Sequence, residues 1–254
     1  MTRVSGAGSA AIVTGGGSGI GRAIAERLAQ DGFKVAIFDR DATAATETAQ
    51  LIDKDGGVAR GYEVDVTDRP RIEAAVTEVE SDLGVPLVLV NNAGIDGFGP
   101  FLKVSTQTWE RTLEVNLTGT FHCCQVVIPR MIDAGWGRIV NISSSSTHGG
   151  QPYMAHYVSS KSGMIGLTKS LALEFGPKGI TVNTIPPGFI DTPMLRASEA
   201  KGLLGGTVED HELRTPVRRA GKPEDIAAMA SFVCRDEASY VTGQILGVNG
   251  GRNT

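Results

Sequence analysis

Seven short apolar segments alternate along this chain with longer segments whose apolar residues recur at helical spacing. The short segments are rich in β-branched residues and are bounded by Gly, Asp, Asn or Pro; they occupy residues 10–14, 34–38, 59–64, 87–90, 138–142, 181–185 and 244–248. The longer segments are predicted helices at 20–30, 42–54, 69–82, 106–134, 157–175 and 223–234. Because strands that alternate with helices form parallel sheets, we expect an α/β fold with a seven-stranded parallel sheet, doubly wound, with helices on both faces.

The length of 254 residues fits one α/β domain, and we predict a single domain over 1–254 because no repeat or linker interrupts the alternation. One stretch, 191–216, lacks clear periodicity and mixes Gly202, Gly205 and Gly206 with charged residues. Long irregular insertions in compact domains are often functional, so we expect a mobile lid over a substrate. The alternative is an irregular surface loop.

Charge and cysteine content exclude several classes of function. The net charge is −4 and the basic residues are scattered, so we expect neither a nucleic acid nor a membrane as partner. No apolar run reaches the roughly 18 residues of a membrane span, and the N-terminus lacks the apolar core of a signal peptide. Cys123, Cys124 and Cys234 are too few and too poorly spaced for a zinc site, and their odd number argues against a disulfide framework and for a reducing compartment. We therefore predict no metal and a cytoplasmic location.

A glycine-rich sequence, TGGGSGIG at 14–21, joins the first predicted strand to the first predicted helix. Bare backbone and the positive end of a helix dipole meet there, which favours binding of a phosphate group. Asp39 ends the second predicted strand, close to the position where a carboxylate takes both ribose hydroxyls of a dinucleotide. A carboxylate would repel a 2′-phosphate, which predicts NAD as the cofactor. Arg40 favours NADP, because a guanidinium pairs with that phosphate, and NADP stays the alternative.

Tyr157 and Lys161 lie four residues apart in a predicted helix and therefore share one face. A nearby ammonium stabilises a phenolate, so this pair predicts a tyrosine that exchanges a proton near neutral pH. Such pairs also arise by chance on helix surfaces. Tyr153 is a rival phenol, but no lysine follows it four residues later.

In order and spacing, these motifs resemble the short-chain dehydrogenase/reductase family over nearly the whole chain. The resemblance rests on the glycine turn, the Tyr157/Lys161 pair and further short motifs, namely Asp65-Val66, Asn91 to Gly94, Asn116, Ser144, Pro187-Gly188, Thr192 and Asn249 to Gly251. It implies a Rossmann-type fold that binds a nicotinamide dinucleotide. It does not by itself give a function.

The resemblance implies roles for particular residues. Asp65 would bond the adenine, Lys161 the nicotinamide ribose, and Ile190 with Thr192 the nicotinamide carboxamide. The full set of implied cofactor contacts is Gly15, Ser18, Gly19, Ile20, Gly21, Asp39, Asp65, Val66, Asn92, Ala93, Gly94, Tyr157, Lys161, Pro187, Gly188, Ile190 and Thr192.

The same resemblance implies four catalytic residues. Tyr157 would be the general acid and base, with its pKa lowered by Lys161 and the nicotinamide. In this family the serine usually lies 13 residues before the tyrosine, which selects Ser144 from the cluster 143–146 as the hydrogen-bond partner of the substrate oxygen. Asn116 would hold a water that links Lys161 to solvent.

We therefore expect an NAD(H)-dependent oxidoreductase that interconverts a secondary alcohol and a ketone, with an acyl-CoA thioester or an alicyclic alcohol as substrate. Its pocket would include the residues Ile95, Asp96, Ser146, His148, Gln151, Tyr153, Pro187 and Met194, with the lid around 195–204.

An NADPH-dependent 3-oxoacyl-acyl-carrier-protein reductase is the alternative. Of the two basic residues thought to dock the carrier in such enzymes, Lys178 matches one, whereas the other falls at Gly135 or Trp136. A nucleotide-sensing regulator without catalysis is the third hypothesis.

The predicted helices at 106–134 and 157–175 carry apolar residues on more than one face, which favours a partner surface. In the family these helices pair across a dimer axis, and the region of Gly250 and Gly251 often forms a second interface. The resemblance therefore implies a homotetramer.

Overall fold

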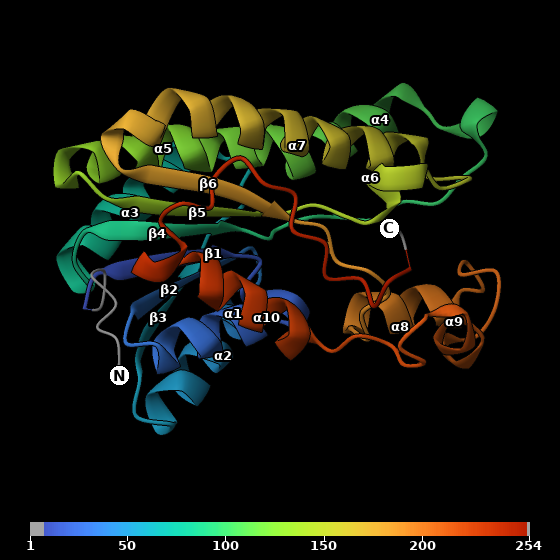
Figure 1. Cartoon of the computed structure of the whole chain (residues 1–254), viewed down its shortest axis with the longest axis horizontal. Helices are drawn as coiled ribbons and strands as arrows, with labels where there is room; N and C mark the ends of the chain where they lie inside the picture. The colour runs from blue at the N-terminus through green and yellow to red at the C-terminus, as the bar shows by residue number, and fades with distance from the viewer. Residues whose placement is uncertain (1–7, 253–254) are drawn as a thin grey trace.

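Six parallel strands lie side by side in one sheet, in the order β3-β2-β1-β4-β5-β6 (Figure 1). The computed structural model describes residues 8–252. β1 is buried along its whole length, as expected of a parallel strand with helices on both sides. The strands are β1 Ala10–Thr14, β2 Lys34–Asp39, β3 Val58–Glu63, β4 Pro86–Asn91, β5 Gly137–Ile142 and β6 Ile180–Ile185.

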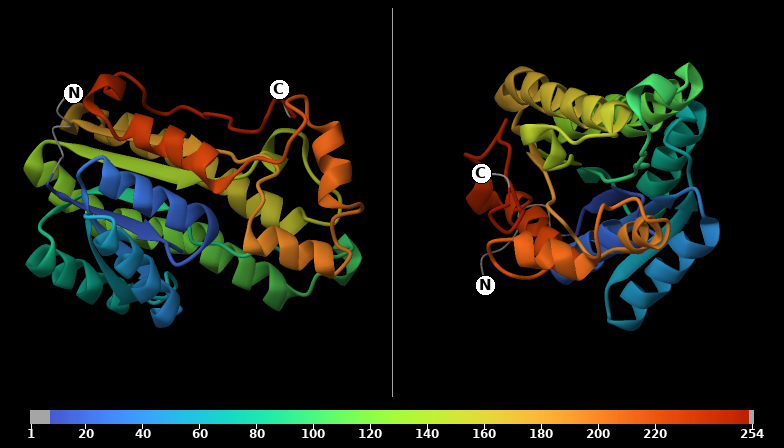
Figure 2. Two further views of the ribbon diagram at one scale, coloured as in Figure 1. Left: turned by 90° about the horizontal axis from the view of Figure 1, so that it is seen from below. Right: turned by 90° about the vertical axis from the view of Figure 1, so that its right-hand side faces the viewer.

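Helices cover both faces of the sheet, as predicted for a doubly wound fold (Figures 1 and 2). One face carries α1 (Gly19–Gln30), α2 (Ala42–Lys54) and α10 (Pro223–Val233). The other carries α3 (Arg69–Asp82), α5 (Gly119–Ala134) and α7 (Ala155–Phe175). Neighbouring residues of a strand point to opposite faces, so Ile37 and Phe38 of β2 belong to two separate hydrophobic cores.

The predicted seventh strand is wrong, because residues 244–248 form only isolated bridges to the end of β6. Gln244 O accepts from Thr184 N (2.9 Å), and Val248 O accepts from Gly188 N (2.9 Å). Pro186 and Pro187 lie between these two points and have no N–H to donate, so a continuous ladder cannot form. The segment runs beside the sheet as a cover for its last strand.

The predicted helix at 106–134 contains a π-helical turn. α4 (Thr106–Leu113) begins at Ser105, whose hydroxyl accepts from Thr108 N (3.0 Å). The π-helical turn follows at Glu114–Thr118 and leads directly into α5. Such turns are frequent at functional sites, and this one contains Asn116.

The segment predicted to be a lid holds two short helices, α8 (Pro193–Ala200) and α9 (Val208–Arg214). They lie beyond the carboxyl end of the sheet (Figures 1 and 2). Thr192 and Thr207 cap them, accepting from Leu195 N (3.2 Å) and Asp210 N (3.2 Å). The remaining short elements are α6 (Ser146–Gly149) and 3₁₀ turns at Phe101–Lys103, Gly176–Lys178 and Asp236–Ala238.

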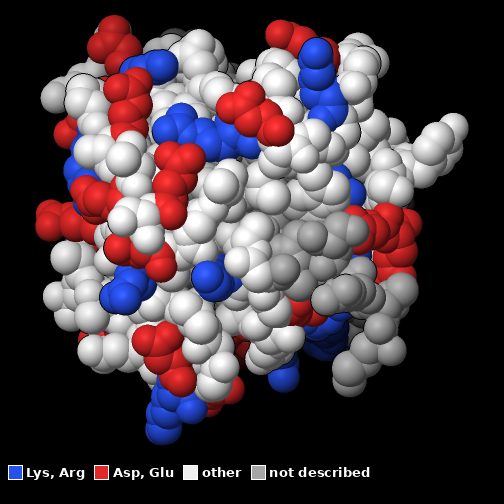
Figure 3. All heavy atoms as spheres, turned by 90° about the vertical axis from the view of Figure 1, so that its left-hand side faces the viewer, with Lys and Arg blue, Asp and Glu red and all other residues white. Residues whose placement is uncertain are grey.

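On the face shown in Figure 3, basic and acidic side chains are interspersed, so this face offers no continuous basic surface to a nucleic acid. Across residues 8–252 no helix has the length and apolar character needed to cross a membrane. Over the same residues, no group of three or more His, Cys, Asp or Glu side chains is placed to hold a metal ion.

Candidate active site

A cleft of about 650 Å³ lies at the carboxyl ends of the strands. The strand order reverses between β1 and β4, and ligands of open α/β sheets bind at such a reversal. All but two of the predicted catalytic and cofactor-binding residues line this cleft. The exceptions are Gly21 and Asn116, which lie behind its wall.

The glycine turn is packed too tightly for side chains. A Cβ on Gly21 would lie 2.1 Å from the backbone oxygen of Gly15, and one on Gly15 would lie 2.9 Å from Cα of Ala93. Gly21 therefore lets the first turn of α1 approach the loop before it. The Ser18 side chain makes no capping hydrogen bond, so first-turn N–H groups of α1 stay available to a ligand. Bare backbone, a helix N-terminus and a long cleft together fit a dinucleotide.

Asp39 is held in position at the end of β2. Its two carboxylate oxygens accept from Gly17 N (2.9 Å) and from Asp41 N (3.1 Å). Each oxygen keeps a lone pair for a further donor, such as a ribose hydroxyl. Arg40 is exposed beside it and also lines the cleft, and no ion pair to it occurs within the described part of the chain.

Asp65 lies at the same end of the cleft. Burial opposes its ionisation, but hydrogen bonds from the Thr67 backbone and hydroxyl, together with the Arg111 guanidinium, hold the pKa of Asp65 below its ordinary value. The Arg111 guanidinium lies 3.5 Å from the carboxylate and lines the cleft. Sequence reasoning missed Arg111, which stands on α4 without any motif around it.

Asn92 braces the glycine turn from the neighbouring strand. Its side-chain amide donates to the backbone oxygens of Thr14 (3.1 Å) and Gly15 (3.0 Å). The Thr14 hydroxyl in turn accepts from the backbone N–H groups of Asn92 (3.1 Å) and Ala93 (3.0 Å). These bonds cross the point where β1 and β4 diverge, and they hold the cleft open between the two strands.

Ser144, Tyr157 and Lys161 lie together in the wall of the cleft. Burial raises the pKa of Tyr157; a hydrogen bond with Ser144 lowers it, and the charge of Asp96 raises it again, so the balance lies above the ordinary value. The Ser144 hydroxyl also hydrogen-bonds the Ser146 hydroxyl (2.9 Å). The family resemblance implies that Lys161 and the nicotinamide lower the pKa of Tyr157. In the protein without its cofactor, this pKa is raised instead.

Lys161 is 4% exposed, and its ammonium donates to the backbone oxygen of Ile142 (2.8 Å). Burial lowers the pKa of Lys161 to about 8. Its Nζ lies 6.0 Å from the centre of the Tyr157 ring. A Cβ on Gly94 would approach that Nζ to 3.3 Å, which explains the bare backbone beside it.

Asn116 is fully buried, and its side chain is engaged by the protein itself. Its amide oxygen accepts from Ile95 N (2.8 Å), and its amide nitrogen donates to Ile95 O (3.0 Å) and to the Ser160 hydroxyl (3.0 Å). It therefore ties the π-helical turn to the loop after β4 and to α7. Its predicted part in a water relay is untested by this arrangement.

The segment after β6 forms the opposite wall. Ser145 N donates to Pro187 O (3.0 Å), which links this wall to the serine cluster. A Cβ on Gly188 would lie 2.6 Å from Cα of Asn249, so only glycine fits there. The Asn249 side chain accepts from Gly251 N (3.0 Å) and shapes the final turn.

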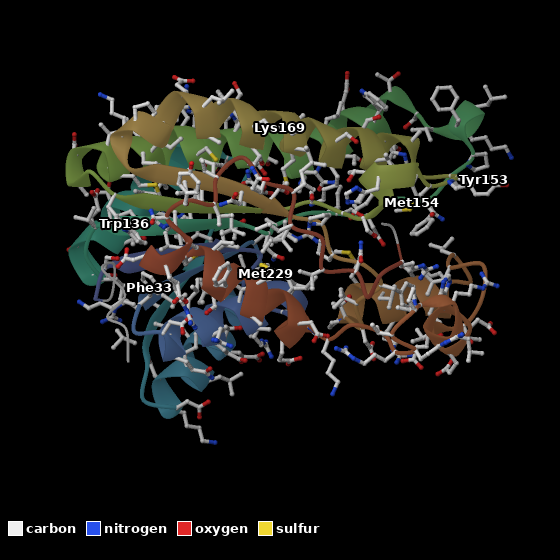
Figure 4. The ribbon with its side chains drawn as sticks, in the orientation of Figure 1. Phe33, Trp136, Tyr153, Met154, Lys169 and Met229 are labelled. Carbon is white, nitrogen blue, oxygen red and sulfur yellow. The ribbon has the colours of Figure 1, made fainter. Side chains whose placement is uncertain are left out.

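The substrate end of the cleft differs from the expected set. Ile95, Asp96, Ser146, Gln151, Pro187 and Met194 line it as predicted. His148 is exposed, and neither it nor Tyr153, which is 65% exposed and points away at the rim, lines the cleft, whereas neighbouring Met154 does (Figure 4). Ser198 and His211 of the predicted lid segment also line the cleft, although neither was singled out. Residues that sequence reasoning missed are Phe98, Val115, Met154, Phe189 and Arg252.

Comparisons with known proteins agree with this architecture. A family model described as enoyl-(acyl carrier protein) reductase matches residues 15–253. The 3-oxoacyl-acyl-carrier-protein reductase FabG of Aquifex aeolicus is 40% identical over 96% of this chain and 97% of its own length. The 2-(S)-hydroxypropyl-CoM dehydrogenase 3 of Xanthobacter autotrophicus is 37% identical over 94% of each chain. A crystal structure of a tryptophan variant of actinorhodin polyketide ketoreductase with NADPH superposes with a TM-score of 0.93, at 35% identity over 97% of both chains.

Proposed function

This chain belongs to the short-chain dehydrogenase/reductase family, a family of oxidoreductases, and on that premise we propose that it interconverts a secondary alcohol and a ketone with NAD(H). The observation that carries the proposal is the gathering of Ser144, Tyr157 and Lys161 in the cleft that also contains the glycine turn and Asp39. An acyl-CoA thioester or an alicyclic alcohol is the proposed class of substrate.

The nicotinamide, when bound, supplies or takes the hydride. In reduction, Tyr157 gives its phenolic proton to the substrate oxygen, and in oxidation it removes the proton from the alcohol. Ser144, which already hydrogen-bonds Tyr157, also donates to the substrate oxygen and holds it beside the phenol. The phenolate left after reduction is stabilised by the Lys161 cation.

Lys161 is suited to this role because its ammonium loses a proton more readily than that of an exposed lysine. Burial lowers the pKa of its ammonium to about 8, so it can exchange a proton near neutral pH. Asn116 fixes the position of this region by joining the loop at Ile95 to Ser160, one residue before Lys161. We propose that Asn116 keeps Lys161 aligned and supports a proton path to solvent.

The preference for NAD(H) rests on Asp39. Its carboxylate is fixed at the end of β2 by two backbone N–H groups and lines the cleft, so its negative charge would meet a 2′-phosphate directly. Arg40 also lines the cleft and is the residue that could reverse the preference. Fluorescence titration with NADH and NADPH tests this point, and tighter binding of NADPH would overturn it.

A turnover screen with the preferred cofactor tests the reaction itself. The panel includes cyclic ketones, 3-oxoacyl-CoA thioesters, diketones and steroids. Turnover of any ketone that disappears in a Tyr157→Phe protein with unchanged NADH binding supports the mechanism. Binding of NADH without turnover of any carbonyl would favour a nucleotide-sensing regulator.

The second candidate is an NADPH-dependent 3-oxoacyl-acyl-carrier-protein reductase. It is supported by the 40% identity to the Aquifex aeolicus reductase and by Arg40 in the cleft. Lys178 is exposed and available for an acidic carrier, but the second basic docking position is absent. Turnover of a carrier-bound thioester well above that of its CoA counterpart would place this candidate first.

We further propose that the protein is a homotetramer. Phe121 on α5 and Leu173 on α7 are 42% and 83% exposed, and the two helices lie together on one side of the molecule (Figure 1). Exposed apolar side chains on adjacent helices favour a partner surface. Light scattering coupled to gel filtration tests the assembly, and a monomeric mass at micromolar concentration would overturn it.

A further inference from the structure

Three side chains far apart in the sequence form a cluster at the substrate end of the cleft. Phe189 and His211 stack with ring centres 4.4 Å apart, and the Arg252 guanidinium lies 5.5 Å from the centre of the Phe189 ring. An Arg252 nitrogen lies 2.9 Å from Nδ1 of His211. All three residues line the cleft that contains Tyr157.

The hydrogen bonds assign the protonation of this histidine. A guanidinium can only donate, so Nδ1 of His211 must accept from Arg252 and carries no proton. The proton is then on Nε2, which donates to the backbone oxygen of Leu204 (3.0 Å). His211 is 8% exposed and bonded through both ring nitrogens, so it is a fixed support for the Arg252 guanidinium.

Among the residues that the structure describes, 8–252, Arg252 is a cation without an acidic partner. Most other arginines of residues 8–252 form ion pairs with carboxylates, but no carboxylate within this range lies within ion-pair distance of Arg252. Burial and the charge of Arg214 lower the pKa of Arg252, as expected where a positive charge lacks compensation. A guanidinium has five donors, and His211 uses one of them. The remaining donors are available to a ligand.

The C-terminal segment holds Arg252 close to the predicted lid, 191–216. Gly250 O accepts from Val217 N (3.4 Å), so the last residues described pack against the segment that follows α9. In Figures 1 and 2 this end of the chain returns to the neighbourhood of α8 and α9. Asp96 is an acidic residue at the same end of the cleft, and its carboxylate accepts a hydrogen bond from the Ser198 hydroxyl (2.9 Å).

We propose that Arg252 is the substrate's anion-recognition residue, so that the physiological alcohol or ketone carries a carboxylate or sulfonate group away from the reacting carbon. This inference rests on the proposed oxidoreductase function and adds a requirement to its substrate, namely an anionic group on the alcohol or ketone. Arg252 pairs with the oxyanion through its planar fork, Phe189 supports the guanidinium from its face, and His211 fixes its orientation. The reacting carbon then lies towards Tyr157 and Ser144.

The test compares keto acids of increasing chain length, keto sulfonates and the methyl esters of the same keto acids in the wild type, Arg252→Met and Arg252→Lys. We expect kcat/KM for the charged substrates to fall by about 10- to 100-fold in Arg252→Met, with partial recovery in Arg252→Lys and little change for the esters. The relative losses for carboxylates and sulfonates identify which oxyanion fits better.

Arg214→Met is the matched control, because Arg214 is exposed on α9 and does not line the cleft. It removes the same charge from the lid and should leave the preference for charged over ester substrates within about twofold, as expected for a screened surface charge. Equal losses for acids and esters in Arg252→Met would overturn the inference and show that Arg252 only holds the lid. Wild-type turnover of esters in preference to acids would also overturn it.

Failure of the proposed function gives a different result. If the wild type turns over neither acids nor esters although it binds NADH, the oxidoreductase proposal fails. Binding of keto acids to the NADH complex, followed by NADH fluorescence in the wild type and Arg252→Met, then still decides whether Arg252 recognises the anion.

Discussion

The ammonium of Lys161 does not hydrogen-bond the phenol of Tyr157. It donates to the backbone oxygen of Ile142 at 2.8 Å, while its nitrogen lies 6.0 Å from the centre of the tyrosine ring. The two residues share a helix face, as their spacing predicts, but no hydrogen bond joins their side chains. The hydrogen bond that acts on the Tyr157 phenol comes from Ser144.

Replacing Tyr157 by Phe should lower kcat by about 10²- to 10⁴-fold, because the proton donor is removed and the ring is retained. NADH binding, measured by fluorescence, should stay within a factor of about two, since the loss concerns a proton and not a contact area. Tyr153→Phe is the control, because Tyr153 is 65% exposed and does not line the cleft. Full activity in Tyr157→Phe would mean that another group transfers the proton.

The stability of the protein should rise with pH because of Lys161. Burial lowers its pKa from 10.5 to about 8, so between these values the unfolded chain binds more protons at this residue than the folded chain. Stability therefore rises with pH through this window, by up to about 1.4 kcal/mol per pH unit for one proton. The rise should be missing in Lys161→Met, in which no proton is taken up at this position.

Urea denaturation at several pH values between 7 and 11 measures this effect as the difference between the two proteins. The difference removes the contributions of all other titrating groups. Parallel stability curves for wild type and Lys161→Met would show that the ammonium is not destabilised in the folded state.

Replacing Asp39 by Asn should weaken NADH binding and improve NADPH binding. The substitution keeps an oxygen that can accept from Gly17 N but removes the charge that repels a 2′-phosphate. Loss of charge-assisted hydrogen bonds to the ribose, about 1.5–3 kcal/mol, corresponds to roughly 10- to 100-fold in NADH affinity. Two fluorescence titrations measure the ratio, and a ratio that does not change would exclude Asp39 as the selector.

Replacing Gly21 by Ala should prevent the glycine turn from closing. The added carbon would lie 2.1 Å from the backbone oxygen of Gly15, and that backbone cannot move without disturbing the bonds from Asn92. We expect a loss of about 2 kcal/mol or more in unfolding free energy, together with loss of NADH binding.

Gly176→Ala is the matched control for Gly21→Ala. Gly176 has a helical φ of −51°, and nothing lies within 4 Å of an added Cβ. Its stability should change by no more than about 0.5 kcal/mol. Thermal unfolding of both variants side by side separates a steric effect from a general effect of replacing glycine.

Most of the sheet could be predicted, because buried parallel strands are short apolar runs with clear boundaries. β1 was predicted with its observed bounds, and the other observed strands were predicted to within one or two residues. The prediction failed at 244–248, where the local pattern is that of a strand. The two prolines that interrupt its pairing lie almost sixty residues earlier, at 186 and 187, so the segment alone carries no sign of them.

The cofactor end of the cleft is predictable for a related reason. Its residues are adjacent in short motifs that each follow a strand, and the carboxyl ends of parallel strands meet at one edge of the sheet. The cluster of Phe189, His211 and Arg252 has no such motif. Its members come from three segments that meet only through tertiary packing, so no local spacing could reveal them.

The partial pairing of 244–248 with β6 also governs how the sheet meets other molecules. An open edge strand is a template for the strand of another chain, and this segment occupies that edge of β6. At the opposite edge, most residues of β3 are exposed, and they include the charged side chains of Arg60 and Glu63. Neither edge of the sheet is therefore open to pairing with a strand of another chain. We expect a concentrated solution of the folded protein to resist edge-to-edge aggregation.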